Sequence, residues 1–285
     1  MRPEPGLPSR AEPGLPSLAE PGLPSLAELG GDLLRTSRVQ AIVELARPLV
    51  WCAIYVLAAS TGAWWSVPFV VFFLFIAVVT AAHDVVHGAL GLTTRATDWS
   101  LFLIGALVLE SGHAYRRTHF RHHSVFPRRE DPEGDPARMS LAGAILHGPV
   151  FLPRLWWWAW RQSRGDPIER RWLACEAAWI AIALVLACCA SPFTRAPLAY
   201  VLLVIAGGWV YPLLTVHLPH RNYGDTRLTQ THTLRGRIVP RLCLELTYHL
   251  EHHLYPDVPS HKLRPLSERL EPYFRAAGVH PTRVP

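Results

Sequence analysis

The sequence predicts an all-α integral membrane protein with four transmembrane helices and a helical cap on one side of the membrane. Three observations lead to this class. Half of the 285 residues are hydrophobic, and the mean hydropathy is positive. The apolar residues gather in runs that approach the roughly 20 residues a helix needs to cross a bilayer. Arginines gather in the segments on one side of these runs.

Four apolar runs have the composition of membrane-spanning helices, and they form two pairs with short links. A fifth run, residues 99–110, is too short to span and suits a buried or re-entrant helix. Together the four spans predict two helical hairpins. The spans cover residues 46–62, 67–82, 172–190 and 196–216.

The distribution of arginine orients these hairpins. Arginines precede the first run, fill the segment between the second and third, and follow the fourth. The two opposite loops, around 63–66 and 191–195, contain one arginine together. Under the positive-inside rule, the arginine-rich side and both termini are cytoplasmic, in a bacterial-type inner membrane. A tryptophan cluster within 156–160 predicts a helix lying in the membrane interface.

The first 40 residues are predicted to form a disordered leader, followed by one membrane domain over residues 41–285. Residues 3–26 repeat the unit Glu-Pro-Gly-Leu-Pro-Ser. Proline at this density disfavours helices and sheets alike. The segment lacks the basic start and continuous apolar stretch of a secretory signal. We expect no chemistry from it.

Charge and cysteine usage exclude two other classes. The formal net charge is +6, but the arginines lie beside apolar runs and do not form a face shared with aromatic residues, so we expect no nucleic-acid partner. None of the five cysteines lies in a C-x-x-C pattern. We therefore expect neither a disulfide framework nor a thiolate metal site.

Eight of the fifteen histidines fall in three short boxes close to apolar runs. Residues three and four apart share one face of a helix, so each box would present its imidazoles together. Neutral imidazole is a common ligand of iron, copper, zinc and nickel. Eight imidazoles are too many for one ion and suit two. The boxes, which predict a two-metal centre, are His83/His87, His119/His122/His123 and His249/His252/His253.

A structural role for these histidines is the alternative. A single H-x-x-x-H on an apolar helix often belongs to a core, whereas two H-x-x-H-H boxes beside it are hard to explain without metal. His217 and His220 follow the fourth run, and one of them is a candidate for an extra ligand. The other histidines are expected to be surface or packing residues: His113, His147, His232, His261 and His280.

The order and spacing of the boxes resemble the integral-membrane fatty acid desaturase superfamily, which includes acyl-lipid desaturases and carotenoid ring hydroxylases and ketolases. The resemblance covers roughly residues 45–270. It implies four spans with a cytoplasmic helical cap that holds a histidine-rich di-iron site, and it implies O2 as co-substrate. His220 is implied as a ligand by Leu218-Pro219-His220-Arg221, which resembles a motif of carotenoid ketolases and hydroxylases. The implied iron ligands, with no catalytic residue beyond them, are His83, His87, His119, His122, His123, His220, His249, His252 and His253.

Two further motifs bear on the substrate. The run Asp-Pro-Glu-Gly-Asp-Pro at 131–136 resembles carotenoid hydroxylases, whereas residues 248–256 resemble many acyl-lipid desaturases. We favour carotenoid ring hydroxylation, with fatty acyl desaturation as the alternative. A haem-binding membrane electron carrier is a remoter alternative, because it needs histidines that face each other across the bilayer interior. A non-catalytic relative is disfavoured by the intact set of boxes.

The implied chemistry needs further groups. A ligating imidazole usually donates its second ring N–H to a carboxylate or carbonyl. Asp84, Asp131, Asp135 and Glu251 are close enough in sequence to serve. The expected substrate is a membrane lipid or carotenoid. Electrons are expected from a separate ferredoxin- or cytochrome-type donor, which the basic loops could dock.

Overall fold

The computed structural model describes residues 22–285, so most of the proline-rich repeat lies outside the described residues. The described chain is mainly helical and contains two short parallel strands, β1 (Leu234–Arg235) and β2 (Thr282–Arg283). The all-α class is confirmed. The longer helices are α2 (Arg38–Ser60), α3 (Val67–Val86), α4 (Thr94–Leu107), α5 (Gly112–Val125), α6 (Leu141–Gln162), α7 (Pro167–Ala190), α8 (Ala196–Pro212) and α12 (Leu263–Ala276). The short ones are α1 (Leu26–Leu29), α9 (Leu218–His220), α10 (Val239–Leu242) and α11 (His249–Leu254), with single turns at Gly31–Leu34, Asp135–Arg138, Ser163–Gly165, Leu213–His217 and Ser260–Lys262.

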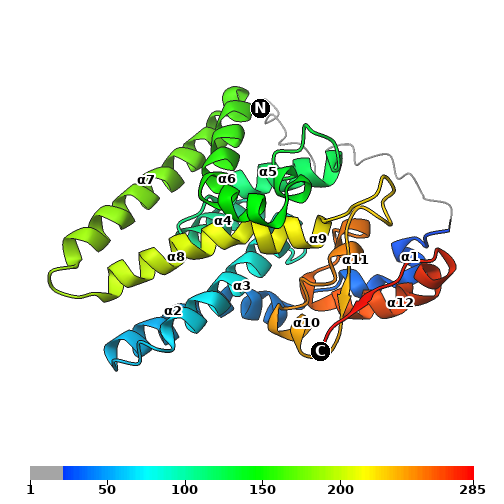
Figure 1. Cartoon of the computed structure of the whole chain (residues 1–285), viewed down its shortest axis with the longest axis horizontal. Coiled ribbons are helices and arrows are strands. Elements are labelled where there is room, and N and C mark those ends of the chain that lie inside the picture. Colours follow the sequence, from blue (N-terminus) through cyan, green and yellow to red (C-terminus); the bar gives the residue numbers. More distant parts are fainter. Residues whose placement is uncertain (1–21) are drawn as a thin grey trace, which may run out of the picture.

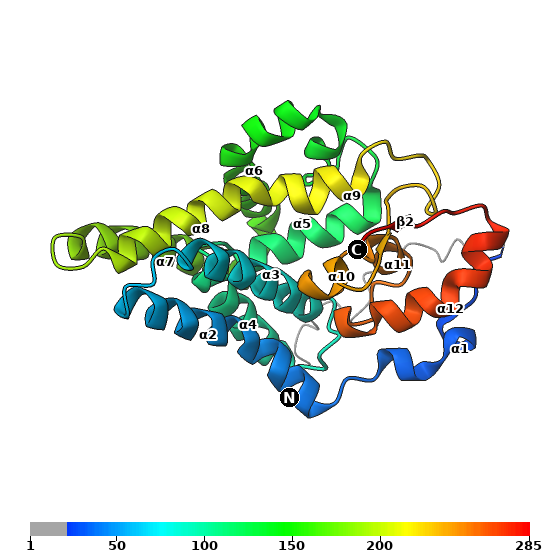
Figure 2. The ribbon, with the colours of Figure 1, turned by 60° about the horizontal axis from the view of Figure 1, so that its bottom comes forward.

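Within residues 22–285, four helices are long and apolar enough to cross a membrane, as the sequence predicted: α2, α3, α7 and the continuous run Ala196–His220, which includes α8 and α9. They form two hairpins whose loops lie at the same end of the molecule (Figure 1). The opposite end carries a helical cap formed by α5, α9–α12 and α1 (Figure 2). The first span begins at Arg38, earlier than expected, because Ser37 and Gln40 form a capping box there.

The two other predicted helices are also present. Helix α4 has 14 residues and packs against α3 and α7, which fits the buried, non-spanning segment expected near residues 99–110. Helix α6 carries the tryptophan cluster, contains Pro149 and Pro153, and is not among the four candidate spans. It packs along α8. Both helices therefore pack against candidate spans without being candidate spans themselves.

The prediction of a disordered leader up to residue 40 is wrong for its last part. Helix α1 and the following turn are helical, and Leu29 and Leu33 are buried against α12. Arg269 of α12 closes this contact with an ion pair to Asp32. Gly30 breaks the helix between the two leucines, and both nevertheless pack into the same apolar cluster. The folded part of the chain therefore starts before the membrane domain assigned to residues 41–285.

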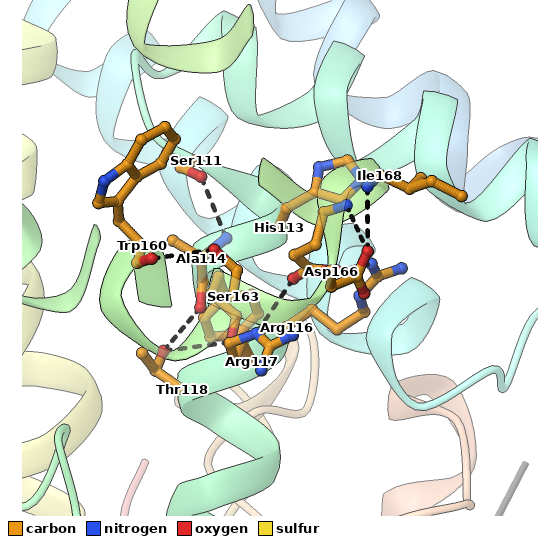
Figure 3. A network of polar contacts seen from close by, with 12 residues as sticks. Ser111, His113, Ala114, Arg116, Arg117, Thr118, Trp160, Ser163, Asp166 and Ile168 are labelled. Atoms are coloured by element: carbon orange, nitrogen blue, oxygen red, sulfur yellow. Dashed lines mark hydrogen bonds and ion pairs between the residues drawn. The ribbon is translucent and has the colours of Figure 1, made fainter. Parts of the chain in front are cut away.

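Helix α5 is the most polar of the longer helices, yet it lies against apolar spans. A buried network of charges holds it there (Figure 3). His113, which the sequence placed at the surface or in simple packing, is fully buried and contacts Glu176 of α7 at 2.7 Å. Arg116 pairs with Asp98 of α4 at 2.8 Å and with Glu169 of α7 at 2.9 Å. These contacts fix α5, which carries the second histidine box, to α4 and α7.

The contact between α6 and α8 depends on Gly148. A Cβ atom there would lie 2.1 Å from the backbone oxygen of Trp209, whose indole donates a hydrogen bond to the Ile145 carbonyl. We expect Gly148→Ala to destabilise the protein by about 2 kcal/mol, because the α8 backbone must move to relieve the overlap. Thermal unfolding in detergent should show a midpoint lowered by roughly 4–8 °C. Gly165→Ala is the control, since a Cβ there meets nothing within 4 Å.

Candidate metal centre

All three histidine boxes meet in the cap, where the end of α3 approaches α5, α9 and α11 (Figure 2). His83 lies in the last turn of α3, and His87 is its C-cap residue. Helical spacing places the members of each remaining box on one side of α5 or α11. His220 ends α9. The nine predicted histidines are therefore brought together, and they divide into two groups.

The first imidazole group contains five rings. The Nε2 atom of His252 lies 2.9 Å from that of His83 and 2.9 Å from that of His123. His119 belongs to the same group, and its Nε2 atom lies 3.2 Å from that of His123. The ring centre of His87 is 4.8 Å from that of His252. Four of these residues present ligand atoms within 4.8 Å of one another: His83, His87, His119 and His252.

The second imidazole group contains four rings. The Nε2 atom of His220 is 3.2 Å from that of His122 and 3.0 Å from that of His249. His253 lies beside them, with its Nε2 atom 3.1 Å from that of His249. Its ring centre is 4.4 Å from that of His123 in the first imidazole group. The two groups are thus neighbours, and His122, His220 and His253 offer ligand atoms within 4.8 Å of one another.

The surroundings suit neutral imidazole. Burial, and then the neighbouring rings, hold the pKa of His123, His249, His252 and His253 well below its usual range. A neutral ring keeps the lone pair that a metal ion needs. The Nε2 atom of His87 is buried without a hydrogen-bond partner among the described residues, and its ring faces other imidazoles. An unpaired buried nitrogen is costly, and a metal ion in the group would remove that cost.

Carboxylates and carbonyls orient several of these rings. Asp131 lies 2.7 Å from Nδ1 of His122, as the sequence predicted. Burial alone would lower the pKa of His122, but the Asp131 charge and hydrogen bond raise it. His220 donates from Nδ1 to the Gln230 carbonyl at 2.9 Å. In both rings Nδ1 is engaged, which leaves Nε2 to face the group.

Glu133 is a partner that the sequence did not reveal. One of its oxygens lies 3.4 Å from Nδ1 of His119, and the other accepts a hydrogen bond from Thr118 at 2.6 Å. Its backbone N–H donates to Asp131 at 2.9 Å. The loop after α5 therefore supplies a coupled pair of carboxylates to two ligand rings. In the sequence, the only indication of this role was that Glu133 is a second acidic residue two positions after Asp131.

Two carboxylates that were candidates for orienting imidazoles bind other side chains instead. Glu251 is fully buried, but it accepts hydrogen bonds from Arg235 and Ser267. Asp135 pairs with Arg138 and Arg154, away from the rings. The third, Asp84, is intermediate: Oδ1 lies 3.5 Å from Nδ1 of His83 and accepts two hydrogen bonds from Ser260. Of the four carboxylates close enough in sequence to serve as ring partners, Glu251 and Asp135 are instead paired with arginine.

The choice between His217 and His220 follows from their positions. His217 ends a π-helical turn over Leu213–His217 and donates from Nδ1 to the Pro136 carbonyl at 2.8 Å. It belongs to neither imidazole group. His220, three residues further along the same run, lies in the second imidazole group. His217 therefore packs against the loop that contains Pro136, whereas His220 lies among the other imidazoles.

Four candidate membrane spans and two adjacent imidazole groups that could hold metal ions define the class of this protein, and comparison with known proteins narrows it to a family. The model of the family described as fatty acid desaturase matches residues 59–284. The chain belongs to the fatty acid desaturase family, as the order of its boxes indicated. A search of curated proteins gave no significant match. Membership implies an oxidoreductase that acts with O2, in a family known for di-iron sites.

Proposed function

We propose that this protein binds two iron ions in its imidazole groups and oxidises a C–H bond of a membrane lipid with O2. The observation that carries the proposal is the convergence of nine imidazoles at one end of four candidate spans. The first imidazole group would supply five ligands and the second four. An all-nitrogen donor set suits iron.

Bound iron would supply the oxidising power to break an unactivated C–H bond with O2. The chain's own residues prepare the site for that chemistry. Asp131, Glu133 and the Gln230 carbonyl hold three imidazoles in fixed orientations. Five of the nine rings are buried and the other four are half-buried, which limits the access of water to them. The helices that end in the cap are apolar along their length, so the substrate reaches the site from the lipid.

Within this reaction class we favour hydroxylation of a carotenoid ring, with fatty acyl desaturation as the alternative. The preference rests on the resemblance of two motifs to carotenoid enzymes. In the structure, the acidic motif provides Asp131 and Glu133 to imidazoles, and the motif after the fourth span provides His220. Both motifs therefore serve the imidazole groups, and the substrate is a separate question that product analysis must answer.

Electrons are expected from a separate acidic carrier of the ferredoxin or cytochrome type, on the cytoplasmic side. A groove of about 720 Å³ in the cap supports this expectation. Its lining includes Tyr248, which directly precedes the third box, together with four arginines and two glutamates. Arg235 and Arg264 form ion pairs with glutamates, and the remaining positive charge would attract an acidic partner. The arginines are Arg235, Arg237, Arg264 and Arg283.

Metal and lipid analysis test the proposal together. Detergent-purified protein should contain roughly two iron ions per chain. Expression in a carotenoid-producing host should yield a more polar carotenoid, whereas a new double bond in the acyl chains of a plain host would favour desaturation instead. Folded protein that contains zinc or no iron, and that changes neither lipid, would refute the oxidase function. A red haem spectrum would revive the electron-carrier alternative.

A further inference from the structure

A small cavity lies beside the first imidazole group, between α3, α8 and the corner that joins α4 to α5. Its walls are mainly apolar, and the polar side chains that line it are Glu110, Tyr115, Tyr211 and Ser111, whose hydroxyl is already bonded to Glu176. We call it the Glu110 cavity. Its volume is about 20 Å³, enough for one atom group the size of water. The other lining residues are Val78, Val79, Ala82, Gly105, Val108 and Gly112.

Glu110 is the unusual member of this cavity. Its Oε1 atom is buried and has no hydrogen-bond partner among the described residues. Leaving such an atom unpaired is costly in free energy. Burial raises the pKa of Glu110 to about 8, so the carboxyl is protonated at neutral pH and presents an O–H donor. A neutral acid in an apolar wall is suited to donate a hydrogen bond to a ligand oxygen.

The backbone conformation at the corner between α4 and α5 fixes the position of Glu110. Leu109 has a φ of 55°, a left-handed conformation that a leucine rarely adopts. The Glu110 N–H donates to the Gly105 carbonyl at 3.0 Å, which closes the corner. A Cβ at Gly105 would lie 2.6 Å from the Glu110 carbonyl oxygen. This is a Schellman-type helix end with a leucine in the position that glycine usually takes, and it fixes the direction in which Glu110 leaves α4.

The cavity shares its walls with the imidazole groups. Ala82 directly precedes His83 in α3. The ring of Tyr115 stacks on the imidazole of His119, with 4.8 Å between their centres. A group in the cavity is therefore about one side chain away from the first imidazole group. A lipid that places its reacting carbon at the imidazoles would bring only its nearest substituents into the cavity.

We propose that the Glu110 cavity is a subsite for the oxygen atom of an oxygenated lipid, a keto or hydroxyl oxygen within a few bonds of the carbon that is oxidised. This inference rests on the proposed function. An oxygen that accepts the Glu110 hydrogen bond satisfies the buried acid, whereas a methylene group leaves it unpaired. Sites with a buried polar group discriminate strongly against ligands that lack the matching group. Glu110 is thus a specificity-determining residue.

Equilibrium binding tests this subsite without turnover. Detergent-purified protein is immobilised, and retention is measured for two pairs of lipids: β-carotene with its monoketo derivative, and octadecane with a mid-chain octadecanone. In at least one pair the ketone should bind about tenfold more tightly to the wild type, corresponding to 1.4 kcal/mol. Glu110→Leu should abolish this preference. Glu110→Gln should retain most of it, because the amide N–H still donates.

Glu245→Leu is the matched control, because Glu245 also has an unpaired buried oxygen and also follows a leucine with positive φ, Leu244, but lies outside the cavity. It should keep the tenfold preference. Iron content and gel filtration establish that each variant is folded. No preference in the wild type, or a tenfold preference that survives in folded Glu110→Leu, overturns the subsite. Failure of the oxidase function would instead appear as absent iron and unchanged host lipids, whatever the binding ratios are.

Discussion

Replacement of His252 by alanine is expected to remove one of the two iron ions and to abolish lipid oxidation. His252 contributes the shortest contacts in the first imidazole group, to His83 and to His123, both at 2.9 Å. Without its nitrogen, two rings lose their common neighbour and the first ion loses a ligand. The loss of turnover should exceed the 10–100-fold that removal of an outer partner of a ligand costs. Metal analysis of purified protein and product analysis of the host measure the two effects.

The matched variants are His253→Ala and His217→Ala. His253 belongs to the second imidazole group, so its replacement should also remove about one ion while the first group keeps its own. His217 is as buried as a ligand, but its Nδ1 donates to the Pro136 carbonyl, so His217→Ala should keep both ions. If His217→Ala lost as much iron as His252→Ala, the losses would reflect general unfolding, and the ligand assignment would fail.

The four spans and the three boxes could be read from the sequence because each depends on local periodicity. An apolar run of sufficient length forms a membrane helix whatever lies beside it. The boxes follow the helical repeat in the same way. The two imidazole groups could not be separated by sequence, because His122 and His123 are adjacent in the chain yet belong to different groups. Which ring joins which group depends on the helix that faces it.

Helical geometry could also have excluded Glu251. At 100° per residue, the rings of His249, His252 and His253 share one side of α11, and Glu251 points to the opposite side. There it meets Arg235 and Ser267. Glu133 was hidden for a different reason. It lies in the irregular segment after α5, where no periodicity relates a side chain to its partner.

The folded segment before α2 and the buried His113 were missed because both depend on distant contacts. Leu29 and Leu33 are isolated apolar residues just after the proline-rich repeat, and they are buried by packing against the cluster that contains α12. His113 looks isolated in the sequence, and its partners lie on other helices, Glu176 on α7 and Asp98 on α4. Contacts between residues far apart in the chain produce no local pattern, so they could not be predicted from the sequence.

The acidic motif at 131–136 allows the role of the ring partners to be tested within one loop. Asp131→Asn should weaken iron binding by about 10–100-fold, as expected for the loss of a partner that orients a ligand. Asp131 accepts from His122 through Oδ2 and from the Glu133 N–H through Oδ1. An asparagine has only one acceptor oxygen, so it cannot serve both donors. Competition for iron against a chelator of known affinity measures the change.

Asp135→Asn is the control from the same motif. Asp135 pairs with Arg138 and Arg154 at a partly exposed site, where an ion pair contributes about 1 kcal/mol or less. Its replacement should leave iron affinity unchanged. Equal losses in both variants would mean that the loop acts through its fold. A loss confined to Asp131→Asn would show that the carboxylate acts through the His122 ring, and that this motif carries information on the metal centre, not on the lipid that reaches it.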